Sequence, residues 1–295
     1  MLRFSREREE EADRAGIKTL EAAGMDPRAM AYMFEKLQRL ARFEGQQVPE
    51  FLMTHPVTKN RIAETYNLIR NYPKKTYPLN LDFQMMRART IVYMSRTVQS
   101  AIAKMRADAK DSDPTRRAGA EYGLALALSE AERTDEAMKY IKKLETEYPD
   151  KIALTVAEAK IDTRADHYDT ADEILKSALE ISPENYPLSM AYARALIKSG
   201  RPKEAEKVLV PMTDKRPLDV NLWYLLAETY GLADNIVGVH EARAEYFVLV
   251  GNTHQAITQL GYALPLVKNN FQETAKIRTR IEQIFKIQQQ EKNGL

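Results

Sequence analysis

The sequence predicts an all-α protein in which repeated helical hairpins stack into an α-solenoid. Three alanines, Ala137, Ala171 and Ala205, stand at equal intervals of 34 residues. A proline follows each of them after twelve residues, and these prolines are Pro149, Pro183 and Pro217. Elsewhere in the chain apolar residues recur every three or four positions, which is the spacing of one face of a helix. Two independent columns with one period indicate a repeated structural unit.

The period and the alanine-to-proline pattern are those of the tetratricopeptide repeat, a helix–turn–helix unit that stacks on its neighbours. We expect repeats at 114–150, 151–184 and 185–218, and a fourth from Asp219. The first helix of the fourth repeat gives the fullest match to the W-x-x-L-G/A-x-x-Y pattern of such repeats, at Trp223, Leu226, Ala227 and Tyr230. We assign Trp223 and Tyr230 to packing between helices. Its second helix is expected to be irregular, because the alanine position falls on Val239. One further helix is expected around Ala256, half a period later.

The helical pattern divides the chain into four expected segments. Residues 1–75 contain three short helices, the last of which is expected to begin at Thr54, and residues 76–112 form one long connecting helix. Residues 113–268 hold the repeats, and the polar residues 269–295 form a helix that caps the open end of the array. Methionines at helical spacing along the long helix are typical of core packing; they are Met85, Met86, Met94 and Met105.

The composition excludes several classes of protein. Lysine and arginine number 44 against 42 acidic residues, and a formal net charge of +2 is too small to predict binding to nucleic acid. No apolar run reaches the length of a membrane span, and the charged residues 1–13 do not form a signal peptide. The absence of cysteine excludes disulfides and thiolate metal sites. The four histidines are not paired at three- or four-residue spacing, so the chain carries no complete catalytic constellation.

The residue types with the most chemistry lie near the amino terminus. On a helix, Glu9 and Asp13 are four residues apart and share a face. Two such carboxylates are compatible with a metal site in which one binds the metal and the other positions a neighbouring ligand. They also fit a solvated helix start, because acids in a first turn interact favourably with the helix dipole. The residues alone favour the solvated helix start.

A set of spaced motifs resembles the zinc metallopeptidases of the HtpX and CAAX-prenyl-protease superfamily. The motifs are Ser5-Arg6-x-x-Glu9-x-x-Ala12-Asp13, Gly16, Ala23-Gly24-Met25-Asp26-Pro27-x-Ala29-Met30, Thr54-His55-Pro56 and Arg61-Ile62. Together with the repeats that follow, they are similar to periplasmic members of that superfamily over nearly the whole chain. The resemblance implies that residues 1–75 are the carboxyl-terminal part of a metallopeptidase domain.

The resemblance also implies roles for four residues. Glu9 corresponds to the glutamate ligand of a zinc ion that two histidines of an HExxH helix also hold, with one position open for water. Asp13 is implied to orient a ligating histidine. His55 and Arg61 match a segment near the active site, which implies supporting catalytic roles. His55 also fits a helix-capping residue without a chemical role.

The HExxH motif of that superfamily is absent, because only Met1 to Arg8 precede Glu9. We therefore interpret Met1 as the start of a fragment, with the signal peptide and the catalytic helix outside it. Zinc is expected in the intact parent protein and not on this chain, which is expected to be inactive by itself.

The repeats provide a second candidate site, because the first helices of such an array line its concave face. The repeat register places seven partner-binding candidates there: Tyr122, Lys160, Arg164, Arg194, Lys198, Asn221 and Tyr224. The pair Lys160 and Arg164 is repeated 34 residues later as Arg194 and Lys198. Four stacked positive charges predict a clamp for an acidic segment or a chain-terminal carboxylate. Solvated helix faces would give the same pattern.

Two functions from different classes follow. The first is part of a periplasmic zinc metalloendopeptidase whose repeats recruit protein or peptide ligands, and the resemblance implies assembly and quality control of outer-membrane β-barrel proteins. The second is a non-catalytic repeat adaptor in which the stretch from Glu9 to Arg61 is structural. An in-frame HExxH ahead of Ser5 in the parent gene would distinguish the two.

Overall fold

The computed structural model describes residues 6–43, 54–73 and 75–292, and all regular structure within these ranges is helical. This confirms the all-α prediction. The chain falls into two compact units, Met1–Leu79 and Asn80–Leu295. The first unit contains α1 (Arg6–Ala22), α2 (Arg28–Phe43) and α4 (Lys59–Ile69).

Local signals end and begin the helices of the first unit. Helix α1 stops at Gly24, whose φ of +68° favours glycine, and the amide of Met25 donates to the carbonyl of Leu20 at 2.8 Å. Helix α2 starts where the Asp26 carboxylate accepts from the amide of Arg28 at 3.0 Å. Among the described residues of this unit, the buried apolar side chains are few: Ile17, Ala31, Phe34 and Ile69.

Helix α4 begins at Lys59, so the expected start at Thr54 was wrong. The side chain of Thr58 accepts from the amide of Arg61 at 3.2 Å and caps the helix. A threonine immediately before a helix satisfies an amide that has no partner within the helix, which explains the later start.

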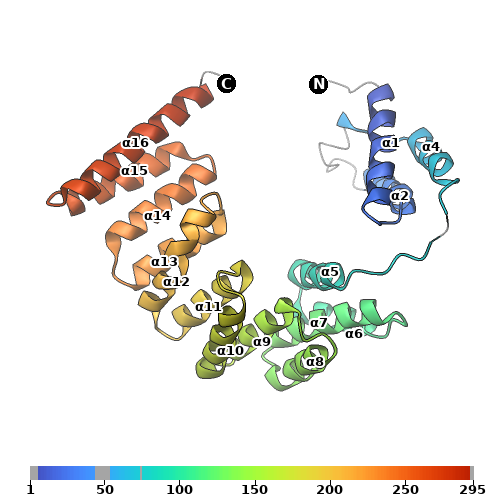
Figure 1. Ribbon diagram of the computed structural model, residues 1–295, viewed down its shortest axis with the longest axis horizontal. Helices are drawn as coiled ribbons and strands as arrows, with labels where there is room; N and C mark the ends of the chain where they lie inside the picture. The colour runs from blue at the N-terminus through green and yellow to red at the C-terminus, as the bar shows by residue number, and fades with distance from the viewer. Residues whose placement is uncertain (1–5, 44–53, 74, 293–295) are drawn as a thin grey trace. The chain divides into compact units, whose positions relative to one another are not determined.

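The second unit is a stack of helical hairpins that follow one another in chain order (Figure 1). The first helices α7, α9, α11 and α13 contact one another in succession, and each second helix packs against the first helix of the next repeat. The elements are α5 (Leu81–Met94), α6 (Val98–Asp108), α7 (Pro114–Glu130), α8 (Thr134–Glu147), α9 (Ile152–Arg164), α10 (Tyr168–Ile181), α11 (Tyr186–Lys198), α12 (Pro202–Lys215), α13 (Val220–Leu232), α14 (Ile236–Leu249), α15 (Thr253–Ala263), the short 3-10 helix η2 (Leu264–Val267) and α16 (Phe271–Lys292).

One backbone turn recurs in every repeat. Residues 34 apart adopt the left-handed conformation, with φ between 59° and 75°: Glu132, Asp166, Gly200 and Asp234. The amide that follows each of them donates to a carbonyl five residues earlier, as Arg201 does to Leu196 at 2.7 Å. The sequence period is therefore also a period of backbone conformation. Gly251, with φ of +77°, repeats this turn half a period later, between α14 and α15.

The alanine column lies where helices meet. Its three members and the later Ala256 are fully buried, with 0% exposure: Ala137, Ala171, Ala205 and Ala256. The expected irregularity of the fourth repeat was wrong, because α14 is continuous across Val239. In this repeat Gly238 makes the close contact, since a Cβ there would lie 2.8 Å from the ring of Tyr230.

The predicted single helix over 76–112 was also wrong, because the structure has α5 and α6 in its place. Ser95 ends α5 in an extended conformation, with ψ of 139°. Thr97 and Ser100 then form a reciprocal capping box, with amide-to-hydroxyl distances of 3.2 and 3.1 Å, which starts a new helix. Both helices pack on α7 and thus form a further hairpin of the array.

Helix α7 approaches α5 at two glycines one turn apart. A Cβ at Gly119 would lie 2.6 Å from Cβ of Gln84 and 2.9 Å from its carbonyl carbon. A Cβ at Gly123 would lie 2.8 Å from Cβ of Ala88. No larger residue fits at these distances without moving α5, so the contact between the two helices depends on glycine.

Gly119→Ala is expected to lower the free energy of unfolding by about 1–3 kcal/mol, because the added methyl must displace the backbone of α5. The matched control is Gly261→Ala in α15, where an added Cβ meets nothing within 4 Å. There the higher helix propensity of alanine should raise stability by up to about 1 kcal/mol. Urea unfolding followed by circular dichroism measures both changes, and equal effects would contradict the close contact.

A cluster of charged side chains joins α8 to α9. Nζ of Lys142 lies 3.2 Å from Glu145 and 2.5 Å from Glu158. Burial, followed by the hydrogen bond to Glu158 and the charge of Glu158, raises the pKa of Glu145 to about 7, and Lys142 only partly opposes this. Glu145 therefore keeps its proton to a higher pH in the folded chain than in the unfolded chain.

Stability is expected to fall as the pH rises from 4.5, the ordinary pKa of glutamate, to about 7, the folded pKa of Glu145. In this pH window the folded state binds one proton more than the unfolded state. The free energy of unfolding therefore falls by at most about 1.4 kcal/mol per pH unit, and it no longer changes with pH above the window. Glu145→Gln removes this titration. Urea unfolding of both proteins at several pH values measures it, and a pH-independent difference between them would refute the raised pKa.

Candidate functional site

The structure brings together the four residues singled out near the amino terminus. Glu9 and Asp13 lie on α1, Arg61 lies on α4, and His55 precedes α4. One carboxylate oxygen of Glu9 contacts Nδ1 of His55, and the other lies 2.9 Å from Nη1 of Arg61. The side chain of Glu9 is 15% exposed. Its carboxylate is therefore held in a defined orientation by partners on two segments.

Asp13 and Arg61 form a bidentate ion pair beneath Glu9. Nε of Arg61 donates to one oxygen of Asp13 at 2.9 Å, and Nη2 donates to the other at 2.6 Å. Asp13 is 5% exposed, and the guanidinium lies 4.9 Å from the centre of the Phe34 ring. The hydrogen bond to Asp13 raises the pKa of Arg61, which keeps the guanidinium charged. This pair connects α1 to α4 and fixes the position of Glu9.

The described residues do not supply a complete zinc site. A catalytic zinc takes three protein ligands, and Glu9 and His55 are two donors of suitable type. No group of three histidine, aspartate or glutamate side chains able to hold a metal occurs within 6–43, 54–73 and 75–292. Both oxygens of Glu9 are occupied by His55 and Arg61. The arrangement thus presents one oriented carboxylate and not a finished metal centre.

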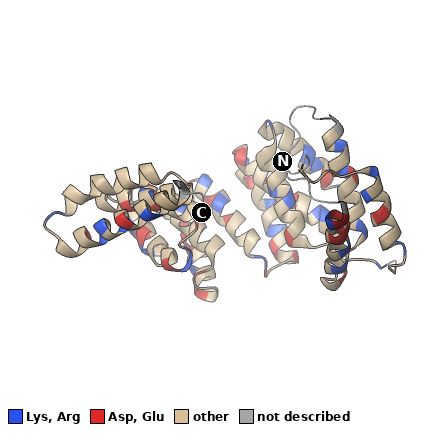
Figure 2. Cartoon of the chain, turned by 90° about the horizontal axis from the view of Figure 1, so that it is seen from above, with Lys and Arg blue, Asp and Glu red and all other residues tan. Residues whose placement is uncertain are grey.

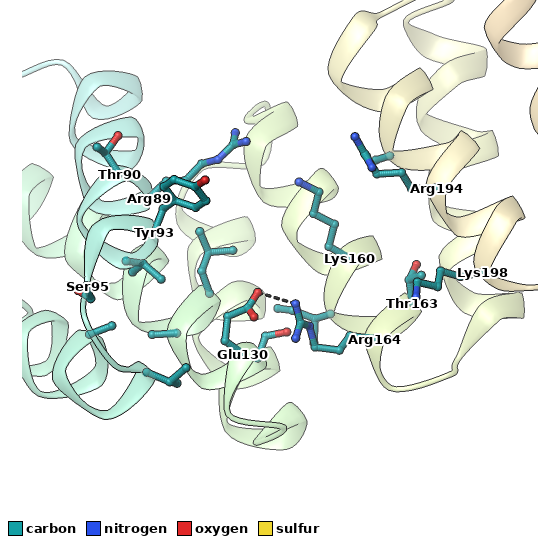
Figure 3. Close-up of a pocket in the computed structure, with 18 of the residues that line it drawn as sticks. Arg89, Thr90, Tyr93, Ser95, Glu130, Lys160, Thr163, Arg164, Arg194 and Lys198 are labelled. Carbon is teal, nitrogen blue, oxygen red and sulfur yellow. Dashed lines mark hydrogen bonds and ion pairs between the residues drawn. The ribbon is translucent and has the colours of Figure 1, made fainter. Parts of the chain in front are cut away.

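A groove of about 1380 Å³ forms the second candidate site, on the array (Figure 3). Residues of α5, α7, α9 and α11 line it, together with those that join α5 to α6. Figure 3 shows Arg89 and Tyr93 on one side and Arg194 on the other, with Lys160 between them. The groove thus extends across first helices of successive repeats.

All four cations predicted for the concave face line this groove: Lys160, Arg164, Arg194 and Lys198. Arg164 lies 2.5 Å from Glu130. Burial lowers the pKa of Lys160, and the charges of Arg89 and Arg194 lower it further. Acidic and basic residues are interspersed over most of the helices (Figure 2), so this accumulation of one sign is local.

The other three partner-binding candidates lie elsewhere. Tyr122 is 4% exposed in the core beneath α5, so it cannot serve as a surface contact, and that prediction was wrong. Asn221 and Tyr224 are exposed on α13 but do not line the groove. The ring of Tyr224 lies 5.7 Å from that of Tyr246 on α14.

Sequence reasoning missed the wall that α5 contributes. Arg89 and Tyr93 on α5 and Arg96 just after it line the groove, and Tyr93 is 86% exposed. These residues fall outside the alanine–proline period, and the segment was interpreted as a connector. The spacing of four residues between Arg89 and Tyr93, which puts both on one face of a helix, was the available signal.

Two family models match the chain in separate segments. Residues 1–68 match Peptidase family M48, and residues 163–229 match a Tetratricopeptide repeat model. Within the part of the chain that the structure describes, no helix has both the length and the apolarity to cross a bilayer.

The chain is 33% identical over 290 residues to the Beta-barrel assembly-enhancing protease of Escherichia coli (strain K12), covering 98% of this chain and 59% of that protein. It is 31% identical over 285 residues to the Putative beta-barrel assembly-enhancing protease of Vibrio cholerae, with 96% and 59% covered. A shorter match of 43% over 60 residues, 20% of this chain and 12% of the relative, is to Mitochondrial metalloendopeptidase OMA1 of Arabidopsis thaliana. The chain thus spans 59% of the length of these two bacterial relatives.

The M48 match covers the motifs around Glu9 and Arg61, and the repeat match covers the periodic part of the chain. The resemblance predicted from those motifs is therefore confirmed: a segment that matches the Peptidase family M48 model precedes one that matches a Tetratricopeptide repeat model, and the chain is similar over nearly its whole length to beta-barrel assembly-enhancing proteases.

Proposed function

We propose that this chain serves in a zinc metalloendopeptidase of family M48, to which it supplies a glutamate ligand and a protein-recruiting array. The observation that carries the proposal is the Glu9 carboxylate, which His55 and Arg61 hold in the segment that matches family M48. A carboxylate oriented in advance binds a metal without a further loss of side-chain freedom.

In this proposal two histidines of an HExxH helix, which this sequence lacks, provide the other ligands. Bound zinc would supply Lewis-acid chemistry and a nucleophilic water. Asp13 and Arg61 hold α1 against α4, so that the Glu9 carboxylate stays in place. His55 lies beside Glu9, where its ring can hydrogen-bond to that carboxylate or to a bound peptide.

The repeats are proposed to recruit substrates or partner proteins, because such arrays expose extended surfaces that bind protein segments. The names of the bacterial relatives point to β-barrel assembly. We therefore propose a periplasmic role in the assembly and quality control of outer-membrane proteins.

The coding sequence ahead of Ser5 provides the first test. An in-frame HExxH behind a signal peptide supports the proposal, and its absence favours a non-catalytic adaptor. In a protein that carries HExxH, Glu9→Gln is expected to lower zinc affinity and casein cleavage by about 100-fold. Glu11→Gln, an exposed acid on the same helix, is the matched control. Full activity of the Glu9→Gln protein would refute the ligand role.

The 295-residue chain by itself is expected to bind no stoichiometric zinc and to cleave no casein, because a single glutamate with one neighbouring imidazole falls short of three ligands. Metal analysis by mass spectrometry after purification with added zinc measures the content. One tightly bound zinc per chain would contradict the need for an HExxH helix.

Asp13→Asn is expected to destabilise the first unit by about 2 kcal/mol, because it breaks a buried, charge-assisted pair of hydrogen bonds to Arg61. Hydrogen exchange of the α1 and α4 amides is the measurement, since a global melt mainly reports the larger repeat array. Glu21→Gln, an exposed change on α1, serves as the control. Unchanged exchange in the Asp13→Asn protein would show that the ion pair does not hold these helices together.

A further inference from the structure

We infer that the groove between α5 and α11 binds an extended acidic peptide segment of a partner protein, and that α5 forms one wall of this site. The inference rests on the proposed function only in that the repeats bind protein. It requires neither zinc nor peptidase activity.

The charges that line the groove are strongly unbalanced. Two acidic side chains, Glu130 and Asp166, face six cationic ones: Arg89, Arg96, Lys160, Arg164, Arg194 and Lys198. The whole chain has a formal net charge of +2, so the groove carries more positive charge than the chain as a whole. An anionic partner would meet a complementary surface here.

Most of the groove cations have no ion-pair partner among the described residues. Arg164 pairs with Glu130 at 2.5 Å. The other five cations have no ion-pair partner within 4.0 Å among the residues described. Elsewhere on the array some cations are paired, as Lys142, Lys143, Arg201 and Arg280 are, and others such as Lys203 and Lys207 have no ion pair among the described residues. The groove differs from an ordinary solvated helix face because five cations from several segments, unpaired within the described part of the chain, line one space.

The unpaired cations come from different helices and face a common space. Lys160 on α9 lies between Arg89 on α5 and Arg194 on α11 (Figure 3). Burial lowers the pKa of Lys160, and the charges of both arginines lower it further. Carboxylates placed among these three groups would relieve their mutual repulsion and accept charge-assisted hydrogen bonds.

The size and the apolar residues of the groove favour a peptide. Its volume of about 1380 Å³ exceeds that of a typical small-molecule pocket, about 300–1,000 Å³. Tyr93 and Met86 on α5 line it with exposures of 86% and 41%. Acidic residues interrupted by one aromatic side chain would satisfy the cations and also cover this apolar surface.

The experiment measures fluorescence anisotropy of a labelled eight-residue peptide of aspartate and glutamate with one central tryptophan, blocked at both ends. Lys160→Glu with Arg194→Glu in the 295-residue chain is expected to raise the Kd at least about tenfold. Lys203→Glu with Lys207→Glu on α12 is the matched control, since both lysines are exposed and outside the groove. The control should stay within about twofold of the unchanged chain.

Further measurements keep the proposal falsifiable. If both double variants bind the peptide equally weakly, binding responds only to the net charge of the protein, and the inference about the groove is refuted. Tighter binding of an eight-base single-stranded DNA than of the peptide would also overturn it. Tyr93→Ala, which changes no charge, is expected to weaken the tryptophan peptide at least threefold and to leave a tryptophan-free acidic peptide unchanged. This variant decides the question if the double reversal fails to fold, which circular dichroism would reveal.

A failure of the peptide test is distinguishable from a failure of the proposed function. If a protein that contains HExxH binds no acidic peptide but keeps its zinc-dependent activity, only the inference about the groove is refuted. If the chain binds the peptide and no HExxH is encoded upstream, the proposed peptidase function is refuted and the groove is the binding site of an adaptor.

Discussion

Helices in this array pack only as closely as the small residues between them allow. The buried alanines, and the glycines of α7 and α14, stand at the positions where two backbones or a backbone and a ring meet. Side chains of greater volume at these contacts would separate the helices and open voids that lose dispersion contacts. The contacts between successive first helices, and with them the groove, depend on this spacing.

The periodic part of the fold could be predicted because each repeat carries its own local signals. The spacing of the alanines and prolines predicted the hairpins of the array. The division at Ser95 could not be predicted from periodicity, because apolar residues continue at helical spacing while a capping box at Thr97 interrupts the backbone. The hydrogen bonds that the Thr97 and Ser100 hydroxyls make to the backbone start a new helix there, although the apolar pattern favours a continuous one.

The candidate sites were predictable to different degrees. The cations on α9 and α11 share the repeat register, so their position followed from the period. Tyr122 shares that register as well, yet α5 covers it, because an element outside the period packs on the first repeat. The ion pair between Asp13 and Arg61 joins residues 48 apart, a contact that depends on tertiary structure. The motif resemblance pointed to both residues but gave no indication that they pair.

The left-handed turns bear on how such an array can vary during evolution. Glu132, Asp166 and Asp234 occupy a conformation that costs an ordinary residue about 1 kcal/mol and that glycine adopts freely, as at Gly200. All three side chains are exposed, so their replacement by glycine or asparagine relieves strain without disturbing the buried core. Sequence drift is therefore tolerated more readily at the turns than at the buried contacts between helices. Related arrays should consequently diverge first at the ends of their hairpins while the spacing of their helices persists.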